Sequence, residues 1–132
     1  MTTIKAYTTI EQSKKLAETL PLDTADQCFL NDGTAIKAEI NSYSVAMKLW
    51  KEHYIEIIPC WSLASLLEQL PYEVCDDDGN SVYLQINKED DVYQLVYTDP
   101  YGDFESIETD RYEHFVDACI ELILKLNKLN LL

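Results

Sequence analysis

The sequence predicts an α+β fold, in which a single two-layer domain spans residues 1–132 and its helices pack on one face of an antiparallel β-meander. Three observations predict this fold. Apolar and polar side chains alternate in runs between Tyr72 and Thr98, as they do in strands, whereas residues 115–132 repeat apolar side chains at helical spacing. No internal repeat or low-complexity linker divides the chain, so one core of packed helices and strands accounts for the pattern.

The first helix is predicted to begin near Thr8, because Thr8 and Glu11 match a T-x-x-E capping box. The apolar residues that follow share one helical face: Ile10, Ala17 and Leu20. Pro21 should end the helix, since proline lacks the amide hydrogen that a helix interior needs.

A small β-hairpin is predicted next, with strands at residues 28–30 and 36–40 around the turn Asn31-Asp32-Gly33. Residues 44–53 favour a helix over a strand, because Ala46, Leu49, Trp50 and His53 recur at helical spacing. The β-branched, alternating run at residues 54–58 is typical of a strand.

A better-marked helix lies between Pro59 and Pro71. Ser62 can cap it, and Trp61 can pack as a hydrophobic staple onto Leu66, which favours a buried structural role for Trp61 over ligand stacking. One stripe of leucines should face the core: Leu63, Leu66, Leu67 and Leu70.

The meander is predicted from three strand-like runs, YEVC, SVYLQIN and DVYQLVYT, which are separated by turns at DDDGN and NKEDD. Their tyrosines, Tyr83, Tyr93 and Tyr97, can form a cross-strand cluster with neighbouring leucine, isoleucine and valine side chains. The run DPYGD should form a further turn, and FESIE a short strand.

The last helix is the strongest prediction in the chain. Asp110 and Glu113 resemble a capping box, and a broad apolar face follows: Phe115, Val116, Cys119, Ile120, Leu122, Ile123, Leu126 and Leu129. Beyond the helix, Leu131 and Leu132 either fold back on the domain or form an oligomer contact. A homo-oligomer through this C-terminal helix is therefore one candidate assembly.

The 24 acidic and 10 basic residues leave a net charge of −14. The average field of such a chain repels phosphates and lipid headgroups, so neither nucleic acid nor a membrane is an expected direct partner. The acidity is explained either by solubility or by imitation of nucleic-acid charge toward a basic protein.

The four cysteines, Cys28, Cys60, Cys75 and Cys119, are scattered without the spacing of a zinc site. With no secretory leader and no long apolar span, we expect a cytoplasmic protein with reduced thiols. We expect no cofactor and no metal.

Catalytic motifs are missing from the sequence, which argues against an enzyme. The two histidines, His53 and His114, are not placed beside a cysteine locally, so a Cys-His pair would need tertiary proximity. The sequence has no G-x-S-x-G, phosphate-binding glycine loop or H-E-x-x-H, and its many carboxylates neither support nor exclude a glycosidase-like pair.

The run Cys75-Asp76-Asp77-Asp78-Gly79-Asn80-Ser81 is the nearest approach to a metal signature. Read as a calcium loop from Asp76, it has Ser81 where glycine is required and Asn87 where glutamate is required. A tight hairpin turn fits instead, with Asp78-Gly79 or Gly79-Asn80 as its pair of positive-φ residues. Asp76, Asp77 and Asp78 are accordingly predicted as an exposed interaction surface for another macromolecule.

Three stretches also carry a resemblance: TIEQSKKLAETLPLDTADQC at residues 9–28, IIPCWSLASLLEQLPYEV at 57–74 and VDACIELILKLNKLNLL at 116–132. They resemble a family of small uncharacterised proteins of Bacteroides-type gut bacteria and their prophages or mobile elements. In that family an E-Q-S-K helix precedes a P-x-W-S-L-x-x-L-L-x-x-L-P segment. The resemblance covers a little under half of the chain and implies a bacterial or phage cytosolic setting and an accessory role. It implies no activity, ligand or site residue.

The leading hypothesis is therefore a non-enzymatic accessory protein that binds another protein through its acidic surface or its apolar C-terminal edge. A second hypothesis is a small-molecule binder or enzyme with a pocket that has His53 or a cysteine at its floor. Several of five aromatic side chains would line this pocket: Tyr83, Tyr93, Tyr97, Trp50 and Trp61. A third is an inhibitor that mimics nucleic acid, which requires carboxylates spaced along one face.

Overall fold

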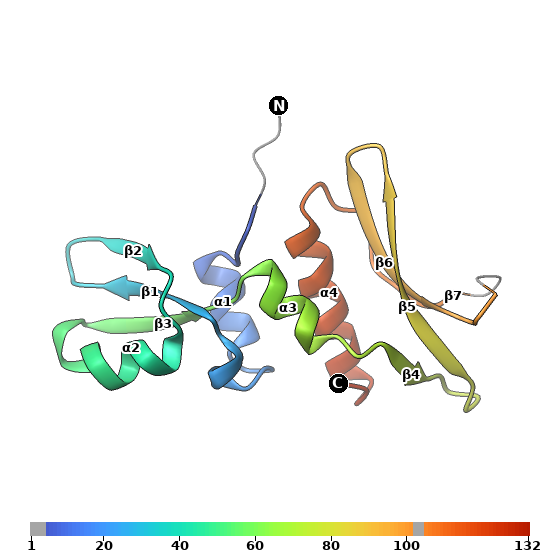
Figure 1. Cartoon of the computed structure of the whole chain (residues 1–132), viewed down its shortest axis with the longest axis horizontal. Coiled ribbons are helices and arrows are strands. Elements are labelled where there is room, and N and C mark those ends of the chain that lie inside the picture. The colour runs from blue at the N-terminus through green and yellow to red at the C-terminus, as the bar shows by residue number, and fades with distance from the viewer. Residues whose placement is uncertain (1–4, 102–104) are drawn as a thin grey trace. The chain divides into compact units, whose positions relative to one another are not determined.

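The computed structural model describes residues 5–101 and 105–132, and within them it shows an α+β protein whose paired strands are all antiparallel (Figure 1). The predicted fold class is confirmed. The strands form two sheets, ordered β2-β1-β3 and β4-β5-β6-β7, where the sequence had indicated one. The chain divides into two compact units, residues 6–65 and residues 1–5 with 66–132. The organisation of residues 1–132 as one domain stays a prediction.

The unit of residues 6–65 is built around the smaller sheet. The predicted hairpin is present as β1 (Gln27–Asn31) and β2 (Ile36–Glu39), and β3 (Glu56–Cys60) pairs with the other edge of β1. Two helices, α1 (Ile10–Leu16) and α2 (Tyr43–Trp50), and two 3₁₀ turns, η1 (Leu22–Thr24) and η2 (Lys51–His53), complete the unit.

The two helices contact opposite faces of this sheet. Ala46 of α2 is buried in a cluster with Cys28, Leu30 and Ile57, whereas Ile10 of α1 packs against the cluster of Phe29, Ile58 and Cys60. Successive residues of a strand face opposite sides, so the alternation along β1 explains both clusters.

The start of α1 differs from the prediction by one residue. Thr9, not Thr8, is the N-cap, and its capping box is completed by Gln12. Thr8 is instead fully buried, where its hydroxyl lies 2.7 Å from Ser13 Oγ and accepts a hydrogen bond from the backbone N–H of Trp61 at 3.2 Å. A side chain held against β3 in this way cannot turn back to cap the helix.

The helix α3 (Leu63–Gln69) is present as predicted, and the hydroxyl of Ser62 accepts from the backbone N–H of Ser65 at 3.2 Å. Trp61 and Leu66 are both fully buried, in keeping with the structural role predicted for Trp61.

The unit that contains residues 66–132 holds the predicted meander. Its strands are β4 (Glu73–Cys75), β5 (Ser81–Glu89), β6 (Val92–Thr98) and β7 (Glu105–Glu108). The ladder between β5 and β6 runs in continuous register from the pair Tyr83–Thr98 to the pair Glu89–Val92. Of the predicted run FESIE, Phe104 lies outside the described residues, as do Gly102 and Asp103 of the predicted turn DPYGD.

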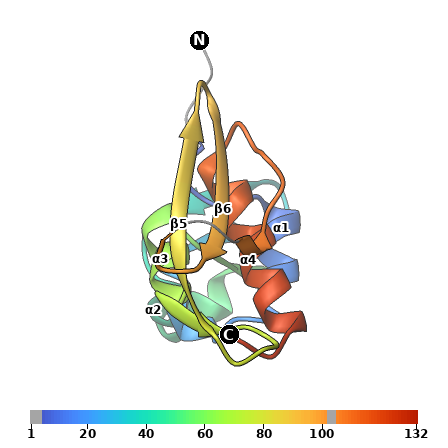
Figure 2. The same ribbon diagram turned by 90° about the vertical axis from the view of Figure 1, so that its right-hand side faces the viewer.

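Figure 2 shows the long β5–β6 hairpin beside α4 (Phe115–Lys128), which packs against β6. Most of the predicted apolar face of this helix is confirmed, since six of its residues are buried: Val116, Cys119, Ile120, Leu122, Ile123 and Leu126. Ala118 is buried with them, whereas Phe115 is half-buried and Leu129 lies past the helix end and is exposed. Its predicted start at Asp110 and Glu113 is wrong, because the helix begins after His114 and has no side-chain cap. Tyr112 is held extended by two backbone hydrogen bonds with Tyr93, at 2.6 and 2.9 Å, which delays the first helical turn.

The chain reverses direction directly after α4. Asn130 has a φ of +58°, its N–H donates to the carbonyl of Asn127, and the N–H of Leu131 donates to the carbonyl of Leu126. This is the Schellman pattern that commonly ends helices. Leu131 is half-buried, whereas Leu129 and Leu132 remain exposed.

Candidate functional site

A turn joins β4 to β5 where CDDDGNS predicted one, but it is not the predicted tight turn: Cys75 pairs with Ser81 and leaves a loop at residues 76–80, in which Gly79 alone has a positive φ. The backbone N–H of Asp76 donates to the carbonyl of Asn80 at 2.9 Å, and Gly79 takes a φ of +79°. The carboxylate of Asp76 also accepts from the N–H groups of Asp78 and Asn80, at 3.0 and 2.8 Å. Asp76 is thus committed to holding the turn, while Asp77 and Asp78 are exposed.

A second acidic turn joins β5 to β6. Glu89 pairs with Val92 across the hairpin, and Asp90 and Asp91 form its exposed two-residue tip, with a φ of +53° at Asp90. Since β5 has nine residues, this tip lies roughly 30 Å from the Asp76–Asn80 turn, at the other end of the strand. The sheet therefore carries exposed aspartates at both ends.

The negative charge is concentrated in the same unit. Residues 1–5 and 66–132 contain 16 of the 24 acidic residues but only five of the 10 basic ones, a net charge of −11. Two of those bases are paired locally, Lys5 with Asp117 at 2.6 Å and Arg111 with Glu89 at 3.7 Å. Residues 6–65 contribute only −3.

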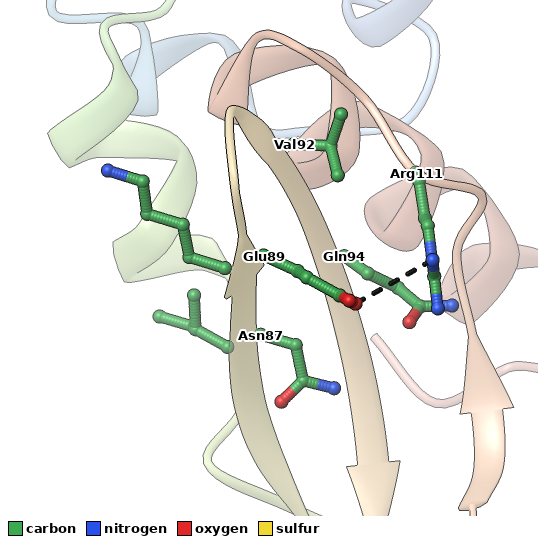
Figure 3. A pocket seen from close by; sticks show the side chains of 7 residues that line it. Asn87, Glu89, Val92, Gln94 and Arg111 are labelled. Carbon is green, nitrogen blue, oxygen red and sulfur yellow. Dashed lines mark ion pairs between the residues drawn. The ribbon is translucent and has the colours of Figure 1, made fainter.

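A polar groove of about 520 Å³ lies beside the β5–β6 hairpin (Figure 3). Figure 3 shows the side chains of Glu89 and Arg111 pointing toward each other across it. Gln94 on β6 donates to the carbonyl of Thr109 at 2.9 Å. The lining contains amide, charged and aliphatic side chains but no serine, cysteine or histidine: Ile86, Asn87, Lys88, Glu89, Val92, Gln94 and Arg111. Such a groove offers hydrogen-bonding and charged groups, among them the carboxylate of Glu89, which is paired with Arg111.

A second groove, of about 650 Å³, is lined by three tyrosines, Tyr72, Tyr83 and Tyr101. The rings of Tyr72 and Tyr83 lie 5.5 Å apart. Five further residues complete the lining: Leu84, Gln85, Thr98, Asp99 and Pro100. The lining is thus mainly aromatic and polar, and it includes no histidine and no cysteine.

The register separates Tyr83 from the other two tyrosines that were predicted to form one cross-strand cluster with it. Tyr83 is paired with Thr98 and therefore faces away from Tyr93 and Tyr97. Tyr93 packs edge-on against Phe115 at 5.1 Å, and the fully buried Tyr97 donates its hydroxyl to the carbonyl of Pro71 at 2.6 Å. Burial raises the pKa of Tyr97. Of Tyr83, Tyr93 and Tyr97, only Tyr83 lines the second groove.

The two tryptophans named for the same pocket lie elsewhere. Trp61 is fully buried, and Trp50 packs against the cluster around Ala46. Neither lines either of the two grooves.

The cysteines do not form a reactive centre. Cys28, Cys60 and Cys119 are buried, and Cys75 is exposed on β4. Burial raises the pKa of Cys28 to about 11 and that of Cys119 to about 12, and it raises the pKa of Cys60 as well. A thiol with such a pKa is almost entirely protonated at neutral pH and is a weak nucleophile.

A set of hydrogen bonds that local sequence patterns do not indicate links residues 24–26 to residues 61–65. The indole N–H of Trp61 donates to Thr24 Oγ1 at 2.9 Å, and Ser65 Oγ donates to the Thr24 carbonyl at 2.5 Å. Asp26 accepts from both the backbone N–H and the hydroxyl of Ser62. These hydrogen bonds tie residues 24–26 to residues 61–65.

Within the part of the chain that the structure describes, no group of three or more His, Cys, Asp or Glu side chains is placed to hold a metal ion. Over the same residues, no helix combines the length and the apolar character needed to cross a bilayer.

Comparison of the chain with known protein families, curated proteins and solved structures gives no match.

Proposed function

We propose that the protein is a non-catalytic accessory protein that binds a basic surface of another protein through the acidic ends of the β4–β7 sheet. The observation that carries this proposal is the charge distribution: residues 1–5 and 66–132 hold a net −11, with exposed aspartates at both ends of β5. Like charges gathered at turn tips attract basic partners and speed their association.

The buried thiols and the composition of the two grooves support a binding role over an enzymatic one. A weakly acidic buried thiol is a poor nucleophile, and a groove without histidine, serine or cysteine lacks the usual acyl-transfer groups. The apolar C-terminal edge is a smaller candidate surface, because most of the apolar face of α4 is buried.

Nucleic-acid mimicry is the less favoured alternative. It needs a row of carboxylates along one face, whereas exposed residues between the two acidic turns of β5 include Gln85, Ile86 and Lys88. Negative charge at two separate turns fits contact with a basic protein surface better than it imitates the evenly spaced phosphates of a nucleic acid.

The setting is part of the same proposal. We place the protein in the cytoplasm of a bacterium, as an accessory product of a prophage or mobile element. The sequence resemblance and the four unpaired thiols support this setting.

The proposal is tested by affinity capture from a lysate of the native host, at low and at high salt. The chain is compared with a variant that neutralises four turn aspartates, Asp77, Asp78, Asp90 and Asp91, each replaced by Asn. A matched control neutralises four exposed acids of residues 6–65: Glu11, Glu18, Glu52 and Glu56, each replaced by Gln. We expect a basic protein to be retained by the chain and the control, lost by the turn variant, and released by salt. No enrichment at low salt, or equal capture by the turn variant, would sink the proposal.

A further inference from the structure

The strand β2 is an edge strand with an exposed apolar face. Within residues 5–101 and 105–132, β1 is the only strand that pairs with it (Figure 1). Ile36 is 45% exposed, Ile40, just past the strand, is 82% exposed, and Ala38 between them is also exposed. Ala38 is paired with Phe29, so these residues belong to the sheet face on which α1 packs. The cluster that Ile10 of α1 covers lies on β1 and β3 and stops short of β2.

The backbone of β2 presents hydrogen-bonding groups to the open edge. The N–H of Asp32 donates to the carbonyl of Ala35 at 3.3 Å, which closes the hairpin. In an antiparallel ladder, hydrogen-bonded and non-hydrogen-bonded pairs alternate. Leu30–Lys37 and Cys28–Glu39 are therefore the hydrogen-bonded pairs of the β1–β2 ladder. The backbone N–H and C=O groups of Ile36 and Ala38 consequently point away from β1.

The residues along this edge are self-complementary. The run Ile36-Lys37-Ala38-Glu39-Ile40, aligned antiparallel with itself about Ala38, places Ile36 opposite Ile40 of a second copy and Lys37 opposite Glu39 of that copy. The same alignment pairs outward-pointing backbone groups with one another. An alignment centred on Lys37 would instead place the two Lys37 side chains opposite each other. An alignment centred between Lys37 and Ala38 would place backbone groups that point away from β1 opposite groups that point toward β1.

We propose that two copies of the chain associate through antiparallel pairing of their β2 strands about a two-fold axis at Ala38, forming a continuous six-stranded sheet. The contact is isologous, so each Lys37–Glu39 ion pair and each Ile36–Ile40 contact occurs twice. Addition of a strand to an exposed sheet edge is a recurrent mode of protein association.

Two further features fit this second copy. The carboxylate of Glu39 accepts from the N–H of Ile40 at 3.2 Å and from Asn41 Nδ2 at 3.4 Å. In the dimer, Ile40 N–H donates to the carbonyl of Ile36 of the second copy, and Glu39 turns to Lys37 of that copy. Moreover, residues 6–65, which contain β2, carry a net charge of only −3. This inference does not depend on the proposed function.

The experiment is sedimentation equilibrium of the purified full chain over a concentration series, at about 0.15 M salt. The dissociation constant is compared among the unaltered chain, Lys37→Glu, Glu39→Lys and the double variant K37E/E39K. Each single reversal sets two pairs of like charges face to face, and we expect it to weaken the dimer at least about tenfold. The double variant restores opposite charges and is expected to bind within about threefold of the unaltered chain.

Two controls separate this contact from others. Lys14→Glu makes the same change of charge at an exposed position of α1 and should leave the dissociation constant unchanged. Ala38→Pro removes the outward N–H of Ala38 without removing a bond of the β1–β2 ladder, and it should abolish the dimer while circular dichroism stays native. A chain that stays monomeric up to its solubility limit would overturn the proposal. So would single reversals without effect, a double variant that fails to recover, or a dimer lost only on Leu129→Ser in the C-terminal helix.

Discussion

The indole N–H of Trp61 donates a hydrogen bond to the hydroxyl of Thr24 at 2.9 Å, across 37 residues of sequence. Thr24 ends the 3₁₀ turn after α1, and Trp61 directly follows β3. The contact thus joins two stretches that lie far apart in the sequence. It explains why a tryptophan stands there, because the ring fills the core and its one polar atom is satisfied.

Replacing Thr24 with valine is expected to lower the free energy of unfolding by about 1–3 kcal/mol, since a fully buried indole N–H loses its acceptor. Urea unfolding measures this change. In a Trp61→Phe background the same replacement should cost much less, because the donor is already gone. Equal costs in the two backgrounds would show that the hydrogen bond contributes nothing to stability.

Asp32 provides a test by pH. The pKa of its carboxyl lies at about 2, below the ordinary 3.8, because the Thr34 hydroxyl and then the N–H groups of Thr34 and Ala35 donate to the carboxylate. A lowered folded-state pKa stabilises the fold above the unfolded pKa. That contribution is lost as the pH falls from about 4 to about 2. We expect Thr34→Ala to raise the pKa of Asp32 toward 3.8 in an NMR titration of its carboxyl carbon, and an unchanged pKa would contradict this account.

The cysteines should differ sharply in reactivity. Cys75 is exposed, whereas the other three thiols are buried and have raised pKa values. With a thiol-specific disulfide reagent at neutral pH, we expect one fast equivalent per native chain and all four only after unfolding. Cys75→Ser should remove the fast phase. A fast phase that survives this replacement would mean that another thiol is accessible.

Replacing Gly33 or Gly79 with alanine is expected to lower the stability of the fold by about the same amount. Their φ values are +94° and +79°, so alanine at either position should destabilise the fold by about 1–2 kcal/mol. A Cβ at Gly33 would also meet Ile55 Cδ1 at 2.7 Å, but Ile55 is 74% exposed and its tip can swing away. Thermal and urea unfolding of both variants measure the costs. A much larger loss for Gly33→Ala, recovered by Ile55→Ala, would show that the contact matters more than the backbone.

The C-terminal turn offers a test of how the chain ends. Asn130 has a φ of +58°, which glycine adopts freely and β-branched residues adopt poorly. We expect Asn130→Gly to be neutral or stabilising by up to about 1 kcal/mol and Asn130→Val to destabilise by at least about 1 kcal/mol. Equal stabilities of the two variants would mean that the last residues do not hold the turn at the end of α4.

Much of the fold was predictable because its signals are local. Three features depend on residues that are close together in the sequence: the turn at Asp76–Asn80, the β5–β6 hairpin and the apolar face of α4. The periodicity of apolar residues and the presence of turn-forming residues can be read directly from such neighbours. The predicted aspartate surface follows from the same turn, although Asp76 proves to be occupied by its own backbone contacts.

Predictions failed where a distant partner competes with a local preference. Thr8 has the chemistry of an N-cap, but its contacts with Ser13 and Trp61 bury it, and the cap passes to Thr9. Asp110 and Glu113 have the spacing of a capping box, but the bridge between Tyr93 and Tyr112 keeps the chain extended as far as His114.

By itself the sequence determined the α+β class, the antiparallel meander, the main helices and the acidic character, because periodicity, turn residues and charge are properties of the chain. Only the tertiary structure decided that the strands form two sheets, that one of the three strand tyrosines faces away from the other two and that Ile36, Ala38 and Ile40 are left exposed on an open edge. The physical reason is that strand register and burial depend on contacts between residues far apart in the chain.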